Sequence, residues 1–295
     1  MRLVFILLHF VLFSCSSTTQ APTVKYLQKE TIVKHKYSSN HVRIFSEKAS
    51  VGEYLVILPS LGRGVEDYTE KYKSTLTNRF VEAGYQVVLI QPRGIGRSTG
   101  KLSGKSTTML ELVDDIRDTL DQLGIKEIWL VGHAFGNRLA RSFTTYYPKY
   151  VKGLALLAAG GNFQMTNEAQ NCLKNSFNMR LEKDKRLEMI SCAFFAKGND
   201  ASIWLNGWFP QLAAAQIHAT STIDANKYKM AAGKKFLIVQ ASEDFIAPPE
   251  LAGKVLAKEL EDQVTYKEVE HAGHALTSEQ PDEVAEIVIE YFKQH

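Results

Sequence analysis

A short turn between two glycines is the first place where this sequence could position reactive groups. Gly-His-Ala-Phe-Gly spans residues 132–136, directly after the apolar stretch EIWLV and directly before the helix-forming segment NRLARSFTTYY. In a strand–turn–helix of this kind the central residue takes a strained backbone conformation, and the glycines let neighbouring backbone approach closely. The central residue is Ala134. Its methyl group cannot attack a carbonyl carbon, so no covalent acyl intermediate can form there.

Acidic and imidazole side chains follow two later strand-like segments. Asp244 and its neighbour Glu243 come after FLIVQAS, and His271 and His274 come after VTYKEV. An imidazole that a carboxylate holds in a fixed orientation can act as a general base. The two histidines could also be a metal pair, but no third cluster of ligands accompanies them. We therefore predict no metal site and no cofactor.

Strand-like and helix-like segments alternate from Thr31 onward. Helical patterns cover residues 67–83 and 108–123, and a last helix starts behind Pro281. This alternation predicts an α/β fold, a mostly parallel sheet with helices on both faces. The predicted strands are an antiparallel edge hairpin, TIVKHKY and HVRIF, followed by EYLVILPS, YQVVLIQP, EIWLV, VKGLALLAA, KKFLIVQAS and VTYKEVE.

One interval, residues 162–232, breaks the alternation. It contains no convincing strand and is rich in aromatic residues, and it is too long for an ordinary connection. We predict a helical cap inserted over the carboxyl ends of the strands, where open α/β sheets place their ligands. Phe194, Trp204 and Trp208 are expected to line a pocket beneath it, which would suit a small apolar ligand. The core would then consist of a first part, 24–161, and a second part, 233–295.

These motifs, in this order, resemble the α/β-hydrolase superfamily of the AB hydrolase-1 type over nearly the whole mature chain. The family pattern at the turn is Gly-His-Ser-X-Gly, whereas position 134 here is alanine. The resemblance implies that Asp244 is the acid and His274 the general base, with Glu243 and His271 as the alternatives. The chain order of turn, acid and histidine is the order that this fold requires.

The resemblance also implies an oxyanion hole. The loop after EYLVILPS is Pro-Ser-Leu-Gly-Arg-Gly, where most relatives have His-Gly. By position, the backbone amides of Leu61 and Phe135 would point at a developing oxyanion. We expect structural roles for Ser60, Arg63 and His133. The stretches PSLGRG, QPRGIGRS and GHAFGN further resemble a bacterial subgroup in which alanine is native at the turn; a deliberate inactivating substitution is the alternative.

The N-terminal residues 1–23 differ in character from the rest. Arg2 precedes an apolar stretch over residues 3–13 that is too short to span a bilayer as a helix, and a polar run follows. This pattern indicates a signal peptide and a polar tether. The segment Leu-Phe-Ser-Cys, which ends at Cys15, resembles a lipobox. We therefore expect an exported bacterial lipoprotein, anchored to a membrane on the periplasmic side by lipid alone; a soluble secreted or periplasmic protein is the alternative.

The two remaining cysteines fit an exported protein. Cys172 and Cys192 lie about equally far from a turn near Glu182, between two predicted helices. An antiparallel helical hairpin would bring them face to face, and a disulfide would form in an oxidising compartment. Two unpaired, buried thiols are the alternative.

The overall charge favours a roughly neutral small molecule or protein as the partner. The formal net charge is +3 and no long run of basic residues occurs, so we expect no binding to nucleic acid. Three functions remain. The first is a hydrolase-like enzyme that acts on a small apolar ester, amide or ketone through a His–Asp pair and an oxyanion hole, without a serine nucleophile. The second is an inactive pseudohydrolase that binds a ligand, and the third is a serine esterase seen as a Ser-to-Ala variant. The retained acid and histidine favour the first.

Overall fold

The computed structural model describes residues 26–47, 52–161 and 163–295. Within these residues a single sheet of nine strands has the order β1-β2-β4-β3-β6-β7-β8-β9, and β5 pairs with β2 outside this path. The strands are β1 (Leu27–Lys34), β2 (Ser38–Ser46), β3 (Tyr54–Leu58), β4 (Gln86–Ile90), β5 (Thr99–Gly100), β6 (Ile128–His133), β7 (Val151–Leu157), β8 (Phe236–Ala241) and β9 (Val264–Val269).

The sheet is parallel in its centre and antiparallel at one edge. β1 and β2 form the antiparallel hairpin that the sequence predicts, and β2 also runs antiparallel to β4. From β4 to β9 all neighbours pair in parallel. Apolar runs such as Leu55–Leu58 are buried throughout, as strands covered on both faces must be. The parallel strands therefore deliver their carboxyl ends to one edge of the sheet.

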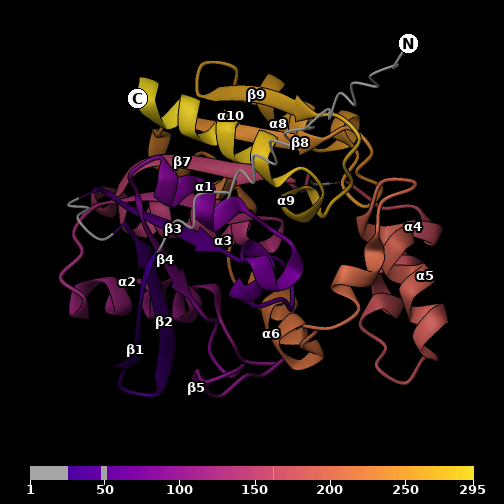
Figure 1. Ribbon diagram of the computed structural model, residues 1–295, viewed down its shortest axis with the longest axis horizontal. Coiled ribbons are helices and arrows are strands. Elements are labelled where there is room, and N and C mark those ends of the chain that lie inside the picture. The colour runs from indigo at the N-terminus through magenta and orange to yellow at the C-terminus, as the bar shows by residue number, and fades with distance from the viewer. Residues whose placement is uncertain (1–25, 48–51, 162) are drawn as a thin grey trace, which may run out of the picture.

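Helices cover both faces of the sheet (Figure 1). α1 (Leu76–Glu82) and α10 (Pro281–Gln294) pack with the core on one face. α2 (Met109–Gln122), α3 (Phe135–Tyr146) and α8 (Gly253–Glu259) pack with the core on the other. α2 begins at a capping box made by Thr108 and Glu111, which explains why its start was predictable.

The single helix predicted over residues 67–83 is wrong. The segment forms two 3₁₀ turns, Val65–Tyr68 and Glu70–Tyr72, and then α1. Lys73 has a φ of 59°, which interrupts any continuous helix. The first turn holds Asp67 and Tyr68 in the interior, where their polar atoms bond to the loop after β3. Tertiary contacts thus override the helical pattern here.

The chain between β7 and β8 is helical. It comprises α4 (Asn167–Ser176), α5 (Lys183–Phe194), α6 (Pro210–Thr220) and α7 (Ala225–Tyr228), and α4 and α5 stand beside the sheet at the right of Figure 1. A disulfide joins Cys172 of α4 to Cys192 of α5, with 5.9 Å between their Cα atoms. Of the two alternatives, a disulfide or two free thiols, the structure contains the disulfide. The bond closes the α4–α5 hairpin.

The predicted signal peptide, the tether at 1–23 and Cys15 lie outside the described residues. Among the helices that the structure describes, none combines the length and the apolar character needed to cross a bilayer.

Candidate active site

The turn at Ala134 has the sharp geometry that the sequence predicts. Ala134 links β6 to α3 with φ 53° and ψ −109°, a region that strains any residue with a Cβ atom. A Cβ atom on Gly132 would lie 2.5 Å from the carbonyl oxygen of Gly136, and one on Gly136 would lie 2.2 Å from that of Leu58. Both glycines are thus sterically required. The turn presents Ala134, partly exposed, at the carboxyl edge of the sheet.

Asp244 and His274 meet at this edge. Asp244 follows β8, His274 follows β9, and Nδ1 of His274 donates a hydrogen bond to Oδ2 of Asp244 at 2.8 Å. The amide of Ala247 and the side chain of Gln240 also donate to the Asp244 carboxylate. Because Asp244 holds the proton on Nδ1, Nε2 of His274 keeps its lone pair and can accept a proton. Both side chains are buried, which gives a preorganised base in a dry environment.

The alternative acid and histidine lie at the surface. Nδ1 of His271 is 3.9 Å from Glu243, and the His271 side chain is 87% exposed. Water competes for such an exposed pair, so Glu243 orients the imidazole only weakly. The geometry favours Asp244 and His274.

The two predicted oxyanion amides come from different parts of the chain. The amide of Phe135 follows Ala134, and the amide of Leu61 lies in the loop after β3. Phe135 is the first residue of α3, so its amide has no partner within the helix. On either side of Leu61, the amide of Ser60 bonds to the hydroxyl of Tyr68 and the amide of Gly62 bonds to Oε1 of Gln216. Within the described residues, no hydrogen bond is donated by the amides of Leu61 and Phe135. Both are therefore free to bind a ligand oxygen.

His133 connects two loops: the loop after β3, residues 59–64, called the oxyanion loop, and the loop after β9 that carries His274, called the histidine loop. Its Nε2 lies 2.8 Å from the carbonyl oxygen of His274, and its Nδ1 lies 3.1 Å from the hydroxyl of Tyr68. A carbonyl can only accept, so Nε2 carries the proton and Nδ1 accepts from Tyr68. Complete burial and the nearby His274 lower the pKa of His133 to about 3. His133 is a neutral structural link, as the sequence suggested.

Arg63 also has a structural role. Its buried guanidinium pairs with Asp67 through two hydrogen bonds of 2.7 and 2.8 Å. It lies 4.4 Å from the ring centre of Trp204 and 4.5 Å from that of Trp208. Burial raises the pKa of Asp67, and Arg63 opposes that shift.

The position of Arg63 bears on the prediction that Trp204 and Trp208 line a ligand pocket. The guanidinium occupies space beside Trp204 and Trp208, and both rings pack in a buried cluster instead of facing open space for a ligand. Phe194 packs in the same buried cluster, but its ring also lies 5.8 Å from the ring of His274. Of the three predicted pocket residues, Phe194 is the one that packs directly against the base.

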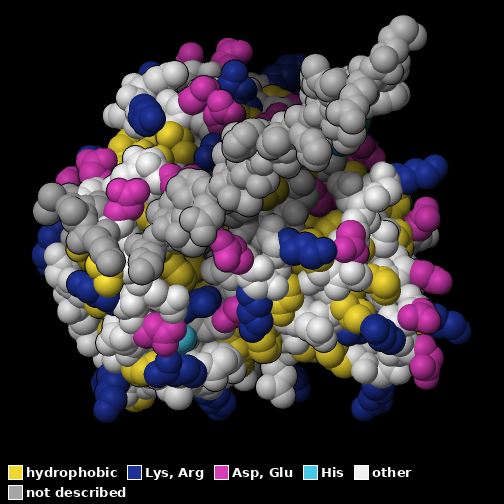
Figure 2. Space-filling view, in the orientation of Figure 1, with side chains coloured by type: hydrophobic (Ala, Val, Ile, Leu, Met, Phe, Trp, Pro, Cys, Tyr) yellow, Lys and Arg dark blue, Asp and Glu magenta, His cyan; other side chains and the backbone are white. Residues whose placement is uncertain are grey.

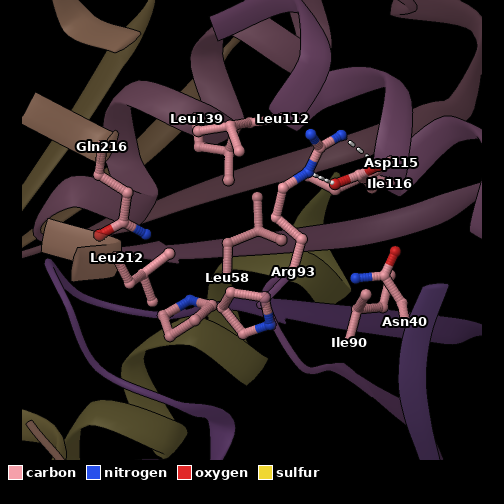
Figure 3. A pocket seen from close by; sticks show the side chains of 12 residues that line it. Asn40, Leu58, Ile90, Arg93, Leu112, Asp115, Ile116, Leu139, Leu212 and Gln216 are labelled. Carbon is pink, nitrogen blue, oxygen red and sulfur yellow. Dashed lines mark hydrogen bonds and ion pairs between the residues drawn. The ribbon is translucent and has the colours of Figure 1, made fainter. Parts of the chain in front are cut away.

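A small cavity lies behind the oxyanion loop (Figure 3). Its volume is about 40 Å³, and Leu58, Leu139, Leu212 and Gln216 are among the residues that line it. The ion pair between Arg93 and Asp115, drawn as dashed lines in Figure 3, closes one side. The space holds a few water molecules at most and is too small for a substrate.

A larger apolar groove opens between α4 and α6. Its volume is about 310 Å³, and its apolar side chains include exposed Ile217. Hydrophobic side chains are visible at the surface over α6 and over α4 and α5 in Figure 2. The groove reaches Leu61, so it leads to the oxyanion loop. Its residues are Leu61, Met165, Gln170, Leu173, Lys174, Phe177, Pro210, Ala213, Ala214 and Ile217.

Three residues that hold the site together were missed by sequence reasoning. Tyr68 and Gln216 bond the amides on either side of Leu61. Glu279 accepts a hydrogen bond from the amide of Gly273, next to His274. Their residue types are ordinary for helical segments, and no local pattern distinguishes them. In the described part of the chain, no three His, Cys, Asp or Glu side chains are grouped to hold a metal ion.

The strand order, the sharp turn and the Asp–His pair define an α/β-hydrolase fold. Residues 60–281 match the family described as serine aminopeptidase, S33, and the chain belongs to that family.

Known relatives agree with this class. A 2-hydroxy-6-oxononadienedioate/2-hydroxy-6-oxononatrienedioate hydrolase from Paraburkholderia phymatum is 31% identical over 148 residues, which cover 48% of this chain and 46% of that protein. Proline iminopeptidase PfmaB from Pestalotiopsis fici is 24% identical over 271 residues, 82% of this chain and 91% of that protein. Two of the relatives, the Paraburkholderia phymatum hydrolase and the abhydrolase domain-containing protein lid-1 from Caenorhabditis elegans, are matched over less than half of their own length.

A solved structure shows the same fold. The 2-hydroxy-6-oxo-6-phenylhexa-2,4-dienoate hydrolase from Rhodococcus sp. strain RHA1 superposes with a TM-score of 0.70 at 16% sequence identity, over 92% of this chain and all of that one.

Proposed function

We propose that this protein is a hydrolase-like enzyme that acts on a small apolar ester, amide or ketone without a serine nucleophile. The observation that carries the proposal is the buried hydrogen bond between His274 and Asp244 at a turn whose central residue is Ala134. The carboxylate of Asp244 and the imidazole of His274 are both in place, whereas Ala134 provides no side chain that could act as a covalent nucleophile. Such a site supports attack by water more readily than acyl transfer.

The chemistry begins at Nε2 of His274. This nitrogen accepts a proton from a water molecule, whose oxygen forms a bond to the carbonyl carbon as the carbonyl π electrons move to oxygen. The amides of Leu61 and Phe135 hold the oxyanion, and each such donor is worth about 3 kcal/mol in the transition state. When the oxyanion collapses, the bond to the oxygen or nitrogen of the ester or amide leaving group breaks, and His274 returns the proton to that atom. A ketone is cleaved in this way where a second carbonyl group takes up the electron pair of the broken C–C bond and the departing carbon receives the proton.

The groove between α4 and α6 supports an apolar substrate. Its lining is mostly apolar and it ends at Leu61, one of the two oxyanion residues. An acyl or alkyl chain in the groove would bring its carbonyl group to the oxyanion amides. The names of the relatives, a proline iminopeptidase and hydrolases of oxo acids, are consistent with attack on a carbonyl or similar group.

An exported, lipid-anchored location completes the proposal. The Cys172–Cys192 disulfide supports an oxidising compartment. Together with the lipobox-like sequence that ends at Cys15, it favours a bacterial lipoprotein on the periplasmic side of a membrane. Mass spectrometry of the N-terminal peptide tests this location, and an unmodified Cys15 in the membrane fraction contradicts it.

A ligand-binding pseudohydrolase is the second candidate. The side chain of His274 is only 7% exposed, which limits the access of water. A serine esterase altered at one residue is the third candidate, because Gly132, Gly136 and the acid–base pair are in place.

One set of assays separates the three. The purified protein is incubated with a panel of p-nitrophenyl esters and with a fluorophosphonate probe, beside His274→Ala, Ala134→Ser and the surface control His271→Ala. We expect slow turnover in the parent, its loss in His274→Ala, its retention in His271→Ala and no probe labelling.

Other results assign the other functions. Binding of an ester without turnover on any substrate supports the pseudohydrolase. Probe labelling and rapid esterase activity in Ala134→Ser alone support the altered serine esterase. Turnover that survives His274→Ala overturns the proposed mechanism.

A further inference from the structure

A second cavity lies beside α3, on the side that faces α7 and α8. Its volume is about 320 Å³, and its lining is more polar than that of the α4–α6 groove. Two arginines of α3, Arg138 and Arg141, contribute to its wall together with Gly160 and Gly161, which follow β7. None of these four residues belongs to the proposed catalytic machinery.

Arg141 is the unusual member of this wall. It is only 5% exposed, yet no carboxylate pairs with it anywhere in the described residues. Its Nε donates one long hydrogen bond of 3.4 Å to the carbonyl oxygen of Asn137, and its guanidinium lies 5.2 Å from the ring centre of Tyr228. A buried cation without a counter-ion is costly, so an anion in the cavity would stabilise it.

The ionisation of Arg141 reflects this environment. Burial and, to a smaller extent, the positive charge of Arg138 lower the pKa of its guanidinium to about 10, and Tyr228 acts in the opposite direction. The group still carries its charge at neutral pH. The lowered pKa agrees with the geometry, in which the buried guanidinium has no carboxylate partner among the described residues.

Arg138 adds a second unmatched charge. It is partly exposed, and among the described residues its side chain has no ion pair or hydrogen bond. Its Nη2 is 4.0 Å from the position that a Cβ atom on Gly160 would take, so the guanidinium borders the glycine backbone. The other two charged groups of the wall, Lys229 and Glu259, pair with each other. The cavity therefore carries two net positive charges.

We propose that this cavity binds the oxyanion group, a carboxylate or a phosphate, of a small ligand. The planar guanidinium of Arg141 presents two parallel N–H donors that match two oxygens of such a group, and Arg138 binds it from the open side. Arg138 is one helical turn beyond Ala134, a rise of about 6 Å along α3. The lining of the cavity includes no residue of the proposed catalytic site, so the anion site does not depend on its activity.

Calorimetric titration of the full-length protein tests the proposal. Sodium phosphate and sodium succinate are titrated separately at low ionic strength into the parent, Arg138→Gln, Arg141→Gln and the control Arg180→Gln. Arg180 is exposed on the α4–α5 hairpin and far in sequence from the cavity. We expect saturable binding of at least one anion, which weakens about 10- to 100-fold in each cavity variant and stays unchanged in the control.

The two anions identify the ligand chemistry. Tighter binding of phosphate indicates a phosphorylated ligand, and tighter binding of succinate indicates a carboxylate. If Arg141→Gln does not fold, as its thermal unfolding curve would show, the comparison rests on the partly exposed Arg138. Absence of saturable binding for both anions at millimolar concentration, or equal binding in Arg138→Gln and the parent, overturns the proposal.

Discussion

The carboxylate of Glu279 accepts a hydrogen bond of 2.8 Å from the backbone amide of Gly273, the residue before His274. Its other oxygen accepts from the amide of Ala196 at 2.8 Å and from the side chain of Asn199 at 2.7 Å. Burial raises the pKa of Glu279, and these donors oppose the shift. One carboxylate therefore ties the loop that carries His274 to the chain that follows α5, and it fixes the backbone next to His274.

We expect Glu279→Gln to loosen this connection. An amide nitrogen would replace one of the two accepting oxygens and would face an N–H donor, so a buried hydrogen bond is lost. The free energy of unfolding should fall by about 1–3 kcal/mol. Urea unfolding measures the change, and the exposed Glu283→Gln on α10 is the control. The low-field proton resonance of His274 Nδ1 should broaden in Glu279→Gln; equal stability and an unchanged resonance would show that Glu279 has no positioning role.

His133 predicts a pH dependence of stability. The pKa of its imidazole is about 3 in the folded protein, against 6.5 as its ordinary value. Between these values the unfolded chain binds a proton that the folded chain does not, so stability falls as the pH falls. The contribution approaches about 1.4 kcal/mol per pH unit.

The variant His133→Gln isolates this contribution. Glutamine keeps an N–H donor for the carbonyl of His274 but has no group that titrates in this range. We expect the variant to be less stable at pH 7 and to lose less stability than the parent between pH 6.5 and pH 5, as measured by urea unfolding at each pH. Parallel pH profiles for the two proteins would mean that His133 is not held neutral.

The buried pair of Arg63 and Asp67 predicts a large effect on stability. Asp67→Asn leaves the guanidinium buried between Trp204 and Trp208 without a counter-ion. We expect a loss of about 3–5 kcal/mol in the free energy of unfolding. The exposed pair Glu250–Lys254 provides the control, because Glu250→Gln should cost less than about 1 kcal/mol. Similar losses in both variants would contradict a buried, tightly coupled pair.

The disulfide predicts redox-sensitive stability. Cys172 and Cys192 are 20 residues apart, and closing a loop of that length stabilises a fold by about 3 kcal/mol in the chain-entropy model. Thermal unfolding with and without dithiothreitol measures the effect, with the double variant Cys172→Ser/Cys192→Ser as control. The parent should unfold at a lower temperature when reduced, whereas the double variant should not respond. A parent that is insensitive to reductant would indicate free thiols.

Local patterns in the sequence were sufficient for the fold class and the turn. Runs of buried apolar residues and regular helix signals predict the parallel sheet, the edge hairpin, α2 and α10 because strand and helix periodicity is a local property. The glycines at 132 and 136 predict the sharp turn, since any Cβ atom there would clash with neighbouring backbone. Ala134 is likewise a fact of the sequence, and it excludes a covalent serine intermediate without any coordinates.

The tertiary structure decided which groups meet. Both Asp244 and Glu243 follow β8, and both His271 and His274 follow β9, so only packing selects the buried pair over the exposed one. The broken helix before α1 has the same cause, because contacts of Tyr68 outweigh a helical pattern. The remaining contacts that support the site join distant parts of the chain. The amide of Gly62 bonds to Gln216, and Arg63 packs against Trp204 and Trp208. Such contacts depend on how completed strands and helices pack, and no local periodicity contains that information.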